Sequence, residues 1–353
     1  SKLRDANGKP LPIHQALFNA DQDANVTHLS MMGIHLASVN SKSLVSEVMA
    51  KKSSSLIRWV PFVPKGSLFP SEGEDESKYR LIVRQAMRKD HVATMNSLVK
   101  ERSKFLLDYL NQHPVIDDVY SFALQQTSKC VGILTYGNTA PDSITDPVDM
   151  TFSRMAVSVI PMLRFIPLFG LRKAYKEGQK HSASINAHLE QIKKDNKEGA
   201  NEKDFCLLTQ MHRANEANGN IISDKELLSN AFGMGVGGND STASAVASVL
   251  FMLAEHPACQ QTLRKEIQDA TDLDHNSLKK LPYLHAVIQE TLRLFPPFSS
   301  SLVRYSEKDE IIDGINIPAG LGVIPCLVAA NRNIVDFGDD AHEWKPERYL
   351  DGS

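Results

Sequence analysis

Two glycines, an acid and two hydroxyl side chains stand almost side by side in the middle of the chain, as Gly237, Gly238, Asp240, Ser241 and Thr242. Glycine inside a helix costs about 1 kcal/mol relative to alanine, and a buried carboxylate costs more unless it is paired. Glycines let a backbone or a ligand approach closely and often accompany a bulge, and an acid followed by hydroxyls supplies a path for protons. The alternative is a helix N-cap, in which the acid and the hydroxyls begin a new helix. Taken alone, the stretch slightly favours the cap.

A second candidate is the pair Glu290 and Arg293 in the segment QETLR, whose spacing places both on one face of a helix. For an isolated pair, the usual interpretation is a surface ion pair worth less than about 1 kcal/mol. Here apolar residues surround the pair, and Pro296 and Pro297 end the helix. Burial would leave guanidinium donors that need further partners. We therefore expect a second arginine, Arg348 in KPERY, and backbone carbonyls to complete the cluster.

A third candidate is Arg304, which stands among apolar and small residues in the segment SSLVRYSEKDEIIDG. On its own, such an arginine is more often an ordinary salt-bridging residue.

The elements that position these residues are mostly helical. Two apolar runs in residues 26–39 predict a β-hairpin, and the alternation and turns after Pro296 predict short strands. Residues 52–75 are predicted to be a loop. Residues 150–172 are apolar but interrupted by prolines and a glycine, which fits a short helix and turn or a patch resting on a membrane. Helical periodicity predicts helices over residues 41–51, 76–111, 117–137, 173–198, 204–216, 224–256, 257–270 and 281–294.

The composition excludes several classes of protein. A net charge of −3 gives no sign of nucleic-acid binding. The four cysteines are widely spaced, which indicates reduced thiols and gives neither a disulfide framework nor a zinc motif. No run of about 18 apolar residues predicts a membrane-spanning helix, and the first residues resemble neither a signal peptide nor an anchor.

The order of the motifs carries more information than any one of them. The acid and hydroxyls are followed by EHPACQQTLRKEI, by E-x-x-R, by an arginine eleven residues later, by G-x-x-I-P-x-G and by P-E-R-Y. From about residue 222 to 350, this succession resembles the cytochrome P450 family of haem-thiolate monooxygenases, in its eukaryotic, fungal-type microsomal form. The resemblance implies a mainly α fold with small β-sheets, in one P450 domain over residues 1–353.

The resemblance also implies a role for the first motif. Residues 237–242 match the family's oxygen-binding groove, [A/G]-G-x-[D/E]-T-[T/S]. Asp240 matches the acid of the family's acid–alcohol pair. Ser241 stands where threonine is usual, keeping the hydroxyl but losing the methyl that restricts its rotamer. Thr242 is then an alternative source of the hydroxyl.

Further roles follow from the resemblance alone. Glu290, Arg293 and Arg348 match the family's buried triad, a structural support beneath the haem. Arginine suits a carboxylate by shape and charge, and the candidates for the haem propionates are Arg304, Arg80 and Arg84. The residues expected to line a mixed apolar substrate pocket are Phe232, Val236 and Ser300.

One departure concerns the iron ligand. The family's ligand is a cysteine in an F-x-x-G-x-R-x-C-x-G loop that follows P-E-R-F, whereas this sequence ends four residues after Tyr349. Cys326, in GVIPCLVAAN, lies too early and lacks the glycines. We therefore expect a P450 fold that is incomplete at its C-terminus, without the ligand loop, the helix after it or the family's membrane anchor, and with no metal ligand in this chain.

The resemblance implies haem b as cofactor, NADPH–cytochrome P450 reductase as electron donor, and insertion of one oxygen atom of O₂ into an apolar small molecule. It implies an intracellular protein, at the endoplasmic reticulum membrane in a full-length form. The alternative is an inactive, truncated P450-like protein that cannot hold haem iron through a thiolate. A third hypothesis, a helical interaction protein without haem, requires the order of the motifs to be coincidence.

Overall fold

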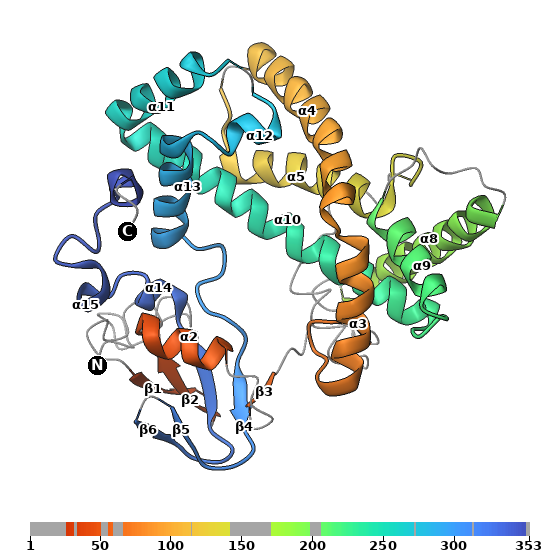
Figure 1. Cartoon of the computed structure of the whole chain (residues 1–353), viewed down its shortest axis with the longest axis horizontal. Coiled ribbons are helices and arrows are strands. Elements are labelled where there is room, and N and C mark those ends of the chain that lie inside the picture. The colour runs from red at the N-terminus through yellow and green to blue at the C-terminus, as the bar shows by residue number, and fades with distance from the viewer. Residues whose placement is uncertain are drawn as a thin grey trace. The chain divides into compact units, whose positions relative to one another are not determined.

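The computed structural model describes residues 26–31, 34–50, 56–58, 66–113, 115–141, 171–197, 206–271, 273–312 and 314–350 (Figure 1). The apolar segment predicted over residues 150–172 lies outside the described residues except at its last two positions. The chain forms two compact units. Unit 1 comprises residues Ser1–Trp59 and Ala245–Ser353, and unit 2 comprises residues Val60–Ser244.

Unit 1 contains a five-stranded sheet in the order β1-β2-β7-β4-β3. Strands β1 (Val26–Met31) and β2 (Ile34–Val39) form the predicted antiparallel hairpin. Strand β2 then pairs in parallel with β7 (Gly322–Pro325), and β7 pairs antiparallel with β4 (Arg304–Ser306). The edge strand β3 (Leu56–Arg58) lies in a segment that the sequence predicts to be a loop. Its three residues are too few to give a period-2 signal.

A helix and a second, two-stranded sheet complete this end of unit 1. Strands β5 (Glu310–Ile312) and β6 (Ile315–Ile317) pair antiparallel. Helix α2 (Lys42–Ala50) places Leu44 and Val48 in one buried cluster with Val39, Ile317 and Val323. Removal of these side chains from water stabilises the sheet and its helix together.

The remaining helices of unit 1 surround α13 (Pro282–Leu294). Its side chains Tyr283 and Val287 form a buried cluster with Leu263 and Trp344. Proline at the first turn of α11 and of α13 suits the fixed backbone angle of a helix start. The other helices of this unit are α11 (Pro257–Asp269), α12 (His275–Leu278), α14 (Leu327–Ala330), α15 (Ile334–Phe337), the 3₁₀ turn η2 (Pro346–Tyr349), and the C-terminal part of α10 (Asp224–Glu255).

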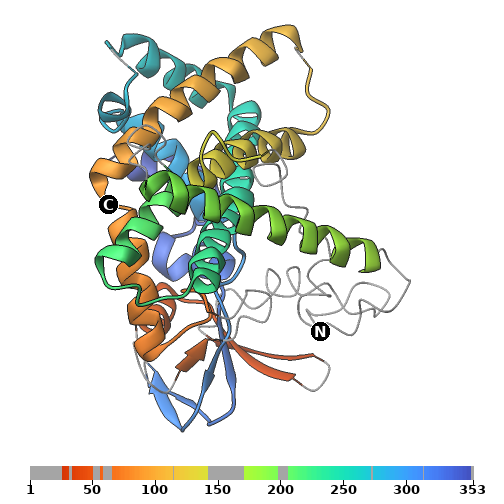
Figure 2. The same ribbon diagram turned by 90° about the vertical axis from the view of Figure 1, so that its right-hand side faces the viewer.

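Unit 2 is helical. It comprises α3 (Gly73–Ala86), α4 (Lys89–Gln112), α5 (Val119–Tyr136), α8 (Leu171–Lys197), α9 (Leu207–Ala217) and α10 up to Ser244. Its core contains Ile82, Leu189, Met211 and Leu227 from four of these helices. Helix α8 crosses the N-terminal half of α10 (Figure 2), where the rings of His181 and Phe232 meet edge-on with centroids 6.4 Å apart.

Two sequence predictions about helices are wrong. The helix predicted over residues 76–111 is interrupted, because Arg88 has an extended backbone (φ −62°, ψ 154°) between α3 and α4. No glycine or proline stands there to signal the break. The N-cap alternative for Asp240 is also wrong, because this residue lies well inside α10, which continues to Glu255 as predicted. Within the described residues, no single helix is long and apolar enough to span a membrane; α10 and α11 pass that test only as a pair bent by 112°.

Candidate functional site

The glycine-rich segment of α10 is α-helical throughout, and its hydroxyls bond back to its own backbone. Ser241 Oγ donates to the carbonyl of Gly237, and Thr242 Oγ1 donates to the carbonyl of Gly238, each at 2.6 Å. Such bonds one turn back compete with the ladder of backbone bonds and often bend a helix. They hold the two hydroxyls beside the two glycine carbonyls.

The glycines face two neighbours within unit 2. A side chain carbon at Gly235 would lie 3.6 Å from Thr135, and one at Gly238 would lie 3.5 Å from Val131, both on α5. These are ordinary contact distances, so α5 packs against α10 at these positions and leaves room for a side chain carbon there.

The other neighbour is Phe69, which the sequence analysis did not identify. A side chain carbon at Gly233 would lie 3.2 Å from its ring, and one at Gly237 would lie 3.7 Å from it. The phenyl ring therefore lies over Gly233 and Gly237, and Gly237 is the residue whose carbonyl accepts from Ser241. Phe69 stands in a segment between elements, where no periodic pattern marks its direction.

The carboxylate of Asp240 is exposed and accepts a hydrogen bond from Tyr120 Oη, at the start of α5. This bond, partial burial, and the charges of Asp240 and Asp118 raise the pKa of Tyr120 to about 12. The phenol therefore stays protonated and continues to donate at any ordinary pH. The preceding residue, Asn239, accepts from Ser128 Oγ at 2.5 Å, so polar contacts join α5 and α10 at two successive positions of α10.

In unit 1, Glu290 and Arg293 lie together in the core, with Glu290 0% and Arg293 4% exposed. Arg293 donates from Nε and Nη2 to the two carboxylate oxygens, each at 2.7 Å. Its remaining donors reach the carbonyls of Asn331 and Ala341 at 2.7 and 2.6 Å, and that of Glu343 at 3.0 Å. A buried guanidinium needs this number of partners.

Arg348 is the second arginine of this cluster. Its Nε lies 3.6 Å from Glu290 Oε1, and its terminal nitrogens donate to the carbonyls of Phe337 and Asp340 at 3.2 and 3.1 Å. The backbone N–H of Lys345 also donates to Glu290 Oε1, at 2.9 Å. The structure thus brings Glu290, Arg293 and Arg348 together with backbone carbonyls, as the spacing and apolar setting predict.

All four cysteines are free thiols. Burial raises the pKa of the Cys326 and Cys130 thiols, which disfavours the thiolate that a metal requires. Cys206 caps α9, accepting from the N–H of Thr209 at 3.4 Å. Over the described ranges, no group of three or more His, Cys, Asp or Glu side chains is arranged to hold a metal ion.

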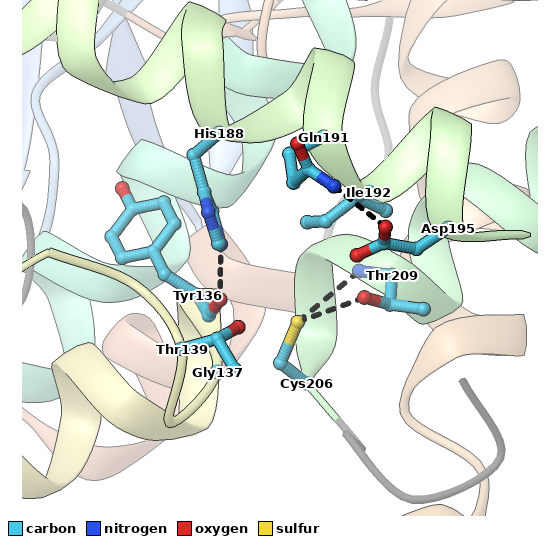
Figure 3. Close-up of a pocket in the computed structure, with 9 residues that line it drawn as sticks. All are labelled: Tyr136, Gly137, Thr139, His188, Gln191, Ile192, Asp195, Cys206 and Thr209. Atoms are coloured by element: carbon cyan, nitrogen blue, oxygen red, sulfur yellow. Dashed lines mark hydrogen bonds between the residues drawn. The ribbon is translucent and has the colours of Figure 1, made fainter. Parts of the chain in front are cut away.

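A pocket of about 280 Å³ lies in unit 2 between the end of α5, α8 and the start of α9 (Figure 3). None of the site residues predicted from the sequence lines it. Polar side chains in it already bond to one another or to the backbone: His188 to the carbonyl of Tyr136 at 2.6 Å, and Gln191 to Asp195 at 2.6 Å. Because no residue of α10 lines it, the pocket is separate from the glycine-rich segment of α10.

The protein family to which the chain belongs follows from its similarity to known sequences. The sequence model of the family described as Cytochrome P450 matches residues 8–353. The chain belongs to the cytochrome P450 family. The fold is similar to that of a retinoic acid-bound cyanobacterial CYP120A1, with a TM-score of 0.74, covering 93% of this chain and 75% of that one at 22% sequence identity. The fold expectation, mainly α with small sheets, is confirmed.

Similar P450 proteins include fungal ones. The ganoderic acid synthetase CYP5150L8 of Ganoderma lucidum is 37% identical over 150 residues, which cover 36% of this chain and 27% of that protein. The cytochrome P450 monooxygenase 91 of Postia placenta is 25% identical over 89% of this chain and 68% of its own length. The matched part thus spans between 27% and 68% of these two relatives.

The remaining site residues of this P450 fall in both units. Arg80 and Arg84 are exposed on α3 in unit 2, and Arg80 pairs with Glu76 one turn earlier. Arg304 is half-buried on β4 in unit 1, opposite Val323 of β7. Within unit 2, Arg80 and Arg84 lie one turn apart on α3.

The predicted substrate-lining residues divide in the same way. Phe232 and Val236 are half-buried on α10 in unit 2, and the ring of Phe232 faces His181 of α8. Ser300 is half-buried in unit 1, in a segment that β7 holds through the bond from the N–H of Ser301 to the carbonyl of Pro325, at 2.8 Å.

Proposed function

We propose that this P450 is a haem-dependent monooxygenase that inserts one oxygen atom of O₂ into an apolar small molecule. The observation that carries the proposal is the glycine-rich segment of α10, where the hydroxyl of Ser241 bonds to a glycine carbonyl and the preceding residue carries an exposed carboxylate. Family membership supports it, because haem is the cofactor that the family implies. When bound, haem supplies the oxygen-activating redox chemistry.

The residues proposed to hold haem are arginines that suit its propionates. Arg304 and Arg84 are candidates whose planar guanidinium groups match a carboxylate. Arg80 is the weaker candidate, because Glu76 already accepts from it. Glu290, Arg293 and Arg348 are proposed to support the haem region from within the fold without taking part in chemistry.

Ser241 is proposed to be the hydroxyl that moves protons. Its hydrogen points at the carbonyl of Gly237, so its oxygen lone pairs remain able to accept a hydrogen bond from water or a ligand. It shares the helix face of Gly237 and Phe69. Thr242 bonds to Gly238, the glycine that faces α5, which makes Ser241 the better candidate of the two.

Asp240 is proposed to be the acid that exchanges protons with solvent. Its side chain is exposed, so bulk water reaches it directly, and it precedes Ser241 in the helix. The side chains proposed to line the apolar substrate site are Phe232, Val236 and Ser300, and Phe69 joins them because its ring lies over the glycine-rich segment.

The finer assignments rest on the family. The continuous match over residues 8–353 supports a single P450 domain. NADPH–cytochrome P450 reductase as electron donor, and the endoplasmic reticulum membrane as location, are proposed because the two fungal relatives are eukaryotic P450 proteins.

The test is oxygen incorporation by the haem-loaded protein with its reductase, using ¹⁸O₂ and a medium-chain alkane as the apolar probe. We expect one ¹⁸O atom in the alcohol product and none from H₂¹⁸O. Asp240→Asn and Ser241→Ala should lower product per NADPH at least tenfold and release more peroxide, because proton transfer by a positioned group contributes 10²-fold or more. Thr242→Ala is the matched control; an equal loss in that variant would refute the preference for Ser241.

A second candidate is a P450 fold that does not hold haem iron through a thiolate. The surroundings of the cysteines favour it, because burial raises the pKa of Cys326 and Cys130 and neither lies in a ligand motif. The two candidates are distinguished by the difference spectrum between the reduced protein with carbon monoxide and the reduced protein alone. A thiolate-type band supports the monooxygenase, and its absence in a folded, haem-loaded protein supports the second candidate.

A further inference from the structure

We propose that Tyr120 is a positioning residue for Asp240, fixing where the carboxylate lies on the surface of α10. The inference rests on the proposed function, in which Asp240 exchanges protons. Tyr120 is the second residue of α5, and its phenol donates to Asp240 Oδ1 across 120 positions of sequence. The two residues belong to the same unit.

The start of α5 is itself held in place. Asp118 caps the helix, accepting from the N–H of Ser121 at 2.9 Å and from Ser121 Oγ at 2.6 Å. A capped first turn fixes the direction of the side chains it carries. The phenol of Tyr120 therefore approaches Asp240 from a rigid element and not from a loop.

The contact continues along the helices. Asn239 accepts a hydrogen bond from Ser128 Oγ. A side chain carbon added at Gly238 would lie at contact distance from Val131 of α5. Helices α5 and α10 are therefore packed together along this stretch, and the tyrosine reaches the acid across that packed pair. In the part of the chain that the structure describes, the charges that act on Tyr120 are those of Asp240 and Asp118; both are acidic and disfavour ionisation, so the phenol acts as a donor.

A carboxylate on an exposed helix surface otherwise samples several rotamers. One charge-assisted hydrogen bond from a rigid donor restricts that sampling, and such bonds are stronger than neutral ones. The role of Tyr120 is therefore to keep the carboxylate of Asp240 in one orientation on α10. Loss of the phenol should misplace the acid without removing it.

The first measurement does not depend on activity. In protein labelled with [¹³Cζ]tyrosine, the resonance missing from Tyr120→Phe identifies Tyr120. At pH 10 we expect about 1% of this phenol to be ionised in the wild type, since its pKa is raised to about 12. In Asp240→Asn the ionised fraction should rise to several tens of per cent, because the charged acceptor is gone. An unchanged fraction would overturn the contact.

The second measurement is peroxide released per NADPH oxidised by the haem-loaded protein with its reductase. Tyr120→Phe should raise this ratio about three- to tenfold, between wild type and Asp240→Asn. Tyr109→Phe is the matched control, because Tyr109 lies on α4 and stacks on His113 and Phe122.

The outcomes separate the two proposals. If Asp240→Asn raises the ratio and Tyr120→Phe matches wild type, Tyr120 has no positioning role, while the proposed function stands. If Asp240→Asn also matches wild type, the acid has no role in proton delivery and both proposals fall. An equal rise in Tyr109→Phe would indicate a general structural effect on the packing of α4 against α5 and would overturn the inference.

Discussion

Glu290 is a fully buried carboxylate, so water cannot replace the hydrogen-bond partners that surround it. Its carboxylate is fully buried and accepts from Arg293, from the N–H of Lys345 and, at longer range, from Arg348. A buried ion pair adds little net stability over apolar side chains of the same shape, whereas loss of one partner leaves an uncompensated charge.

Glu290→Gln should therefore lower the free energy of unfolding by about 3–5 kcal/mol, because the Arg293 charge would stay buried without its counter-ion. Urea unfolding at neutral pH measures it. Lys345→Met is the matched control, since its exposed ammonium pairs with Asp340 and Glu343 in the same segment. That control should cost less than about 1 kcal/mol. Similar losses in the two variants would contradict the special position of Glu290.

At this scale the sequence allowed the arginine cluster to be predicted, but not the side chains that contact the glycine-rich segment of α10. Spacing and an apolar setting suffice to say that Glu290 and Arg293 are buried and need partners. Neither Phe69 nor Tyr120 could be found in the same way. Their contacts with α10 join positions more than 100 residues apart, and no local pattern records which way such a side chain points.

At the scale of elements, α10 combines glycines that differ in the space around them. At Gly235 an added methyl would meet Thr135 at an ordinary 3.6 Å, whereas at Gly233 it would meet the ring of Phe69 at 3.2 Å. Both positions lie inside the same helix, so the intrinsic gain from alanine is about the same, roughly 1 kcal/mol.

Gly235→Ala should therefore stabilise the protein by up to about 1 kcal/mol, and Gly233→Ala should stabilise it less or destabilise it. The comparison is made by urea unfolding of both variants. Combining Gly233→Ala with Phe69→Leu should recover the lost stability, as coupling between neighbours requires. If the stability changes of Gly233→Ala and Phe69→Leu simply add in the double variant, the ring of Phe69 does not restrict a side chain at position 233.

The start of α10 carries a capping box. Ser223 Oγ lies 3.4 Å from the N–H of Glu226, and Glu226 accepts from the N–H of Ser223 at 2.7 Å. Tyr79 Oη also donates to Glu226, at 2.6 Å. The hydrogen bonds from Ser223 and Tyr79 hold the pKa of Glu226 below its ordinary value of 4.5.

Because the folded-state pKa is the lower one, this carboxylate stabilises the fold above about pH 4.5 and ceases to do so as the pH falls through the folded-state pKa. Glu226→Gln should thus be less stable than wild type at pH 7, and the difference should shrink below about pH 4.5. Thermal unfolding across this range measures it. Glu255→Gln, an exposed glutamate at the other end of α10, is the matched control. A difference that does not change with pH would contradict the role of the charge.

At the scale of the whole molecule, the order of the motifs was more informative than any element. It led to the family and to a mainly α fold. Helical periodicity placed α10, α11 and α13 within about a residue of their observed bounds. What it could not give was the break between α3 and α4 or the edge strand β3. Both depend on contacts that the rest of the fold imposes on a few residues with no strong preference of their own.

The partners of Arg293 also have a consequence for how the chain folds. Residues 331–345 contain little regular structure. Their carbonyls at Asn331, Ala341 and Glu343 nevertheless accept the remaining hydrogen bonds of Arg293, which lies on the preceding helix α13. Helix α13 cannot bury its arginine until this segment arrives, so the two should gain order as one cooperative unit. In hydrogen exchange, the amide of Lys345, bonded to Glu290, should exchange as slowly as the centre of α13. Fast exchange at Lys345 beside a protected α13 would show that they open separately.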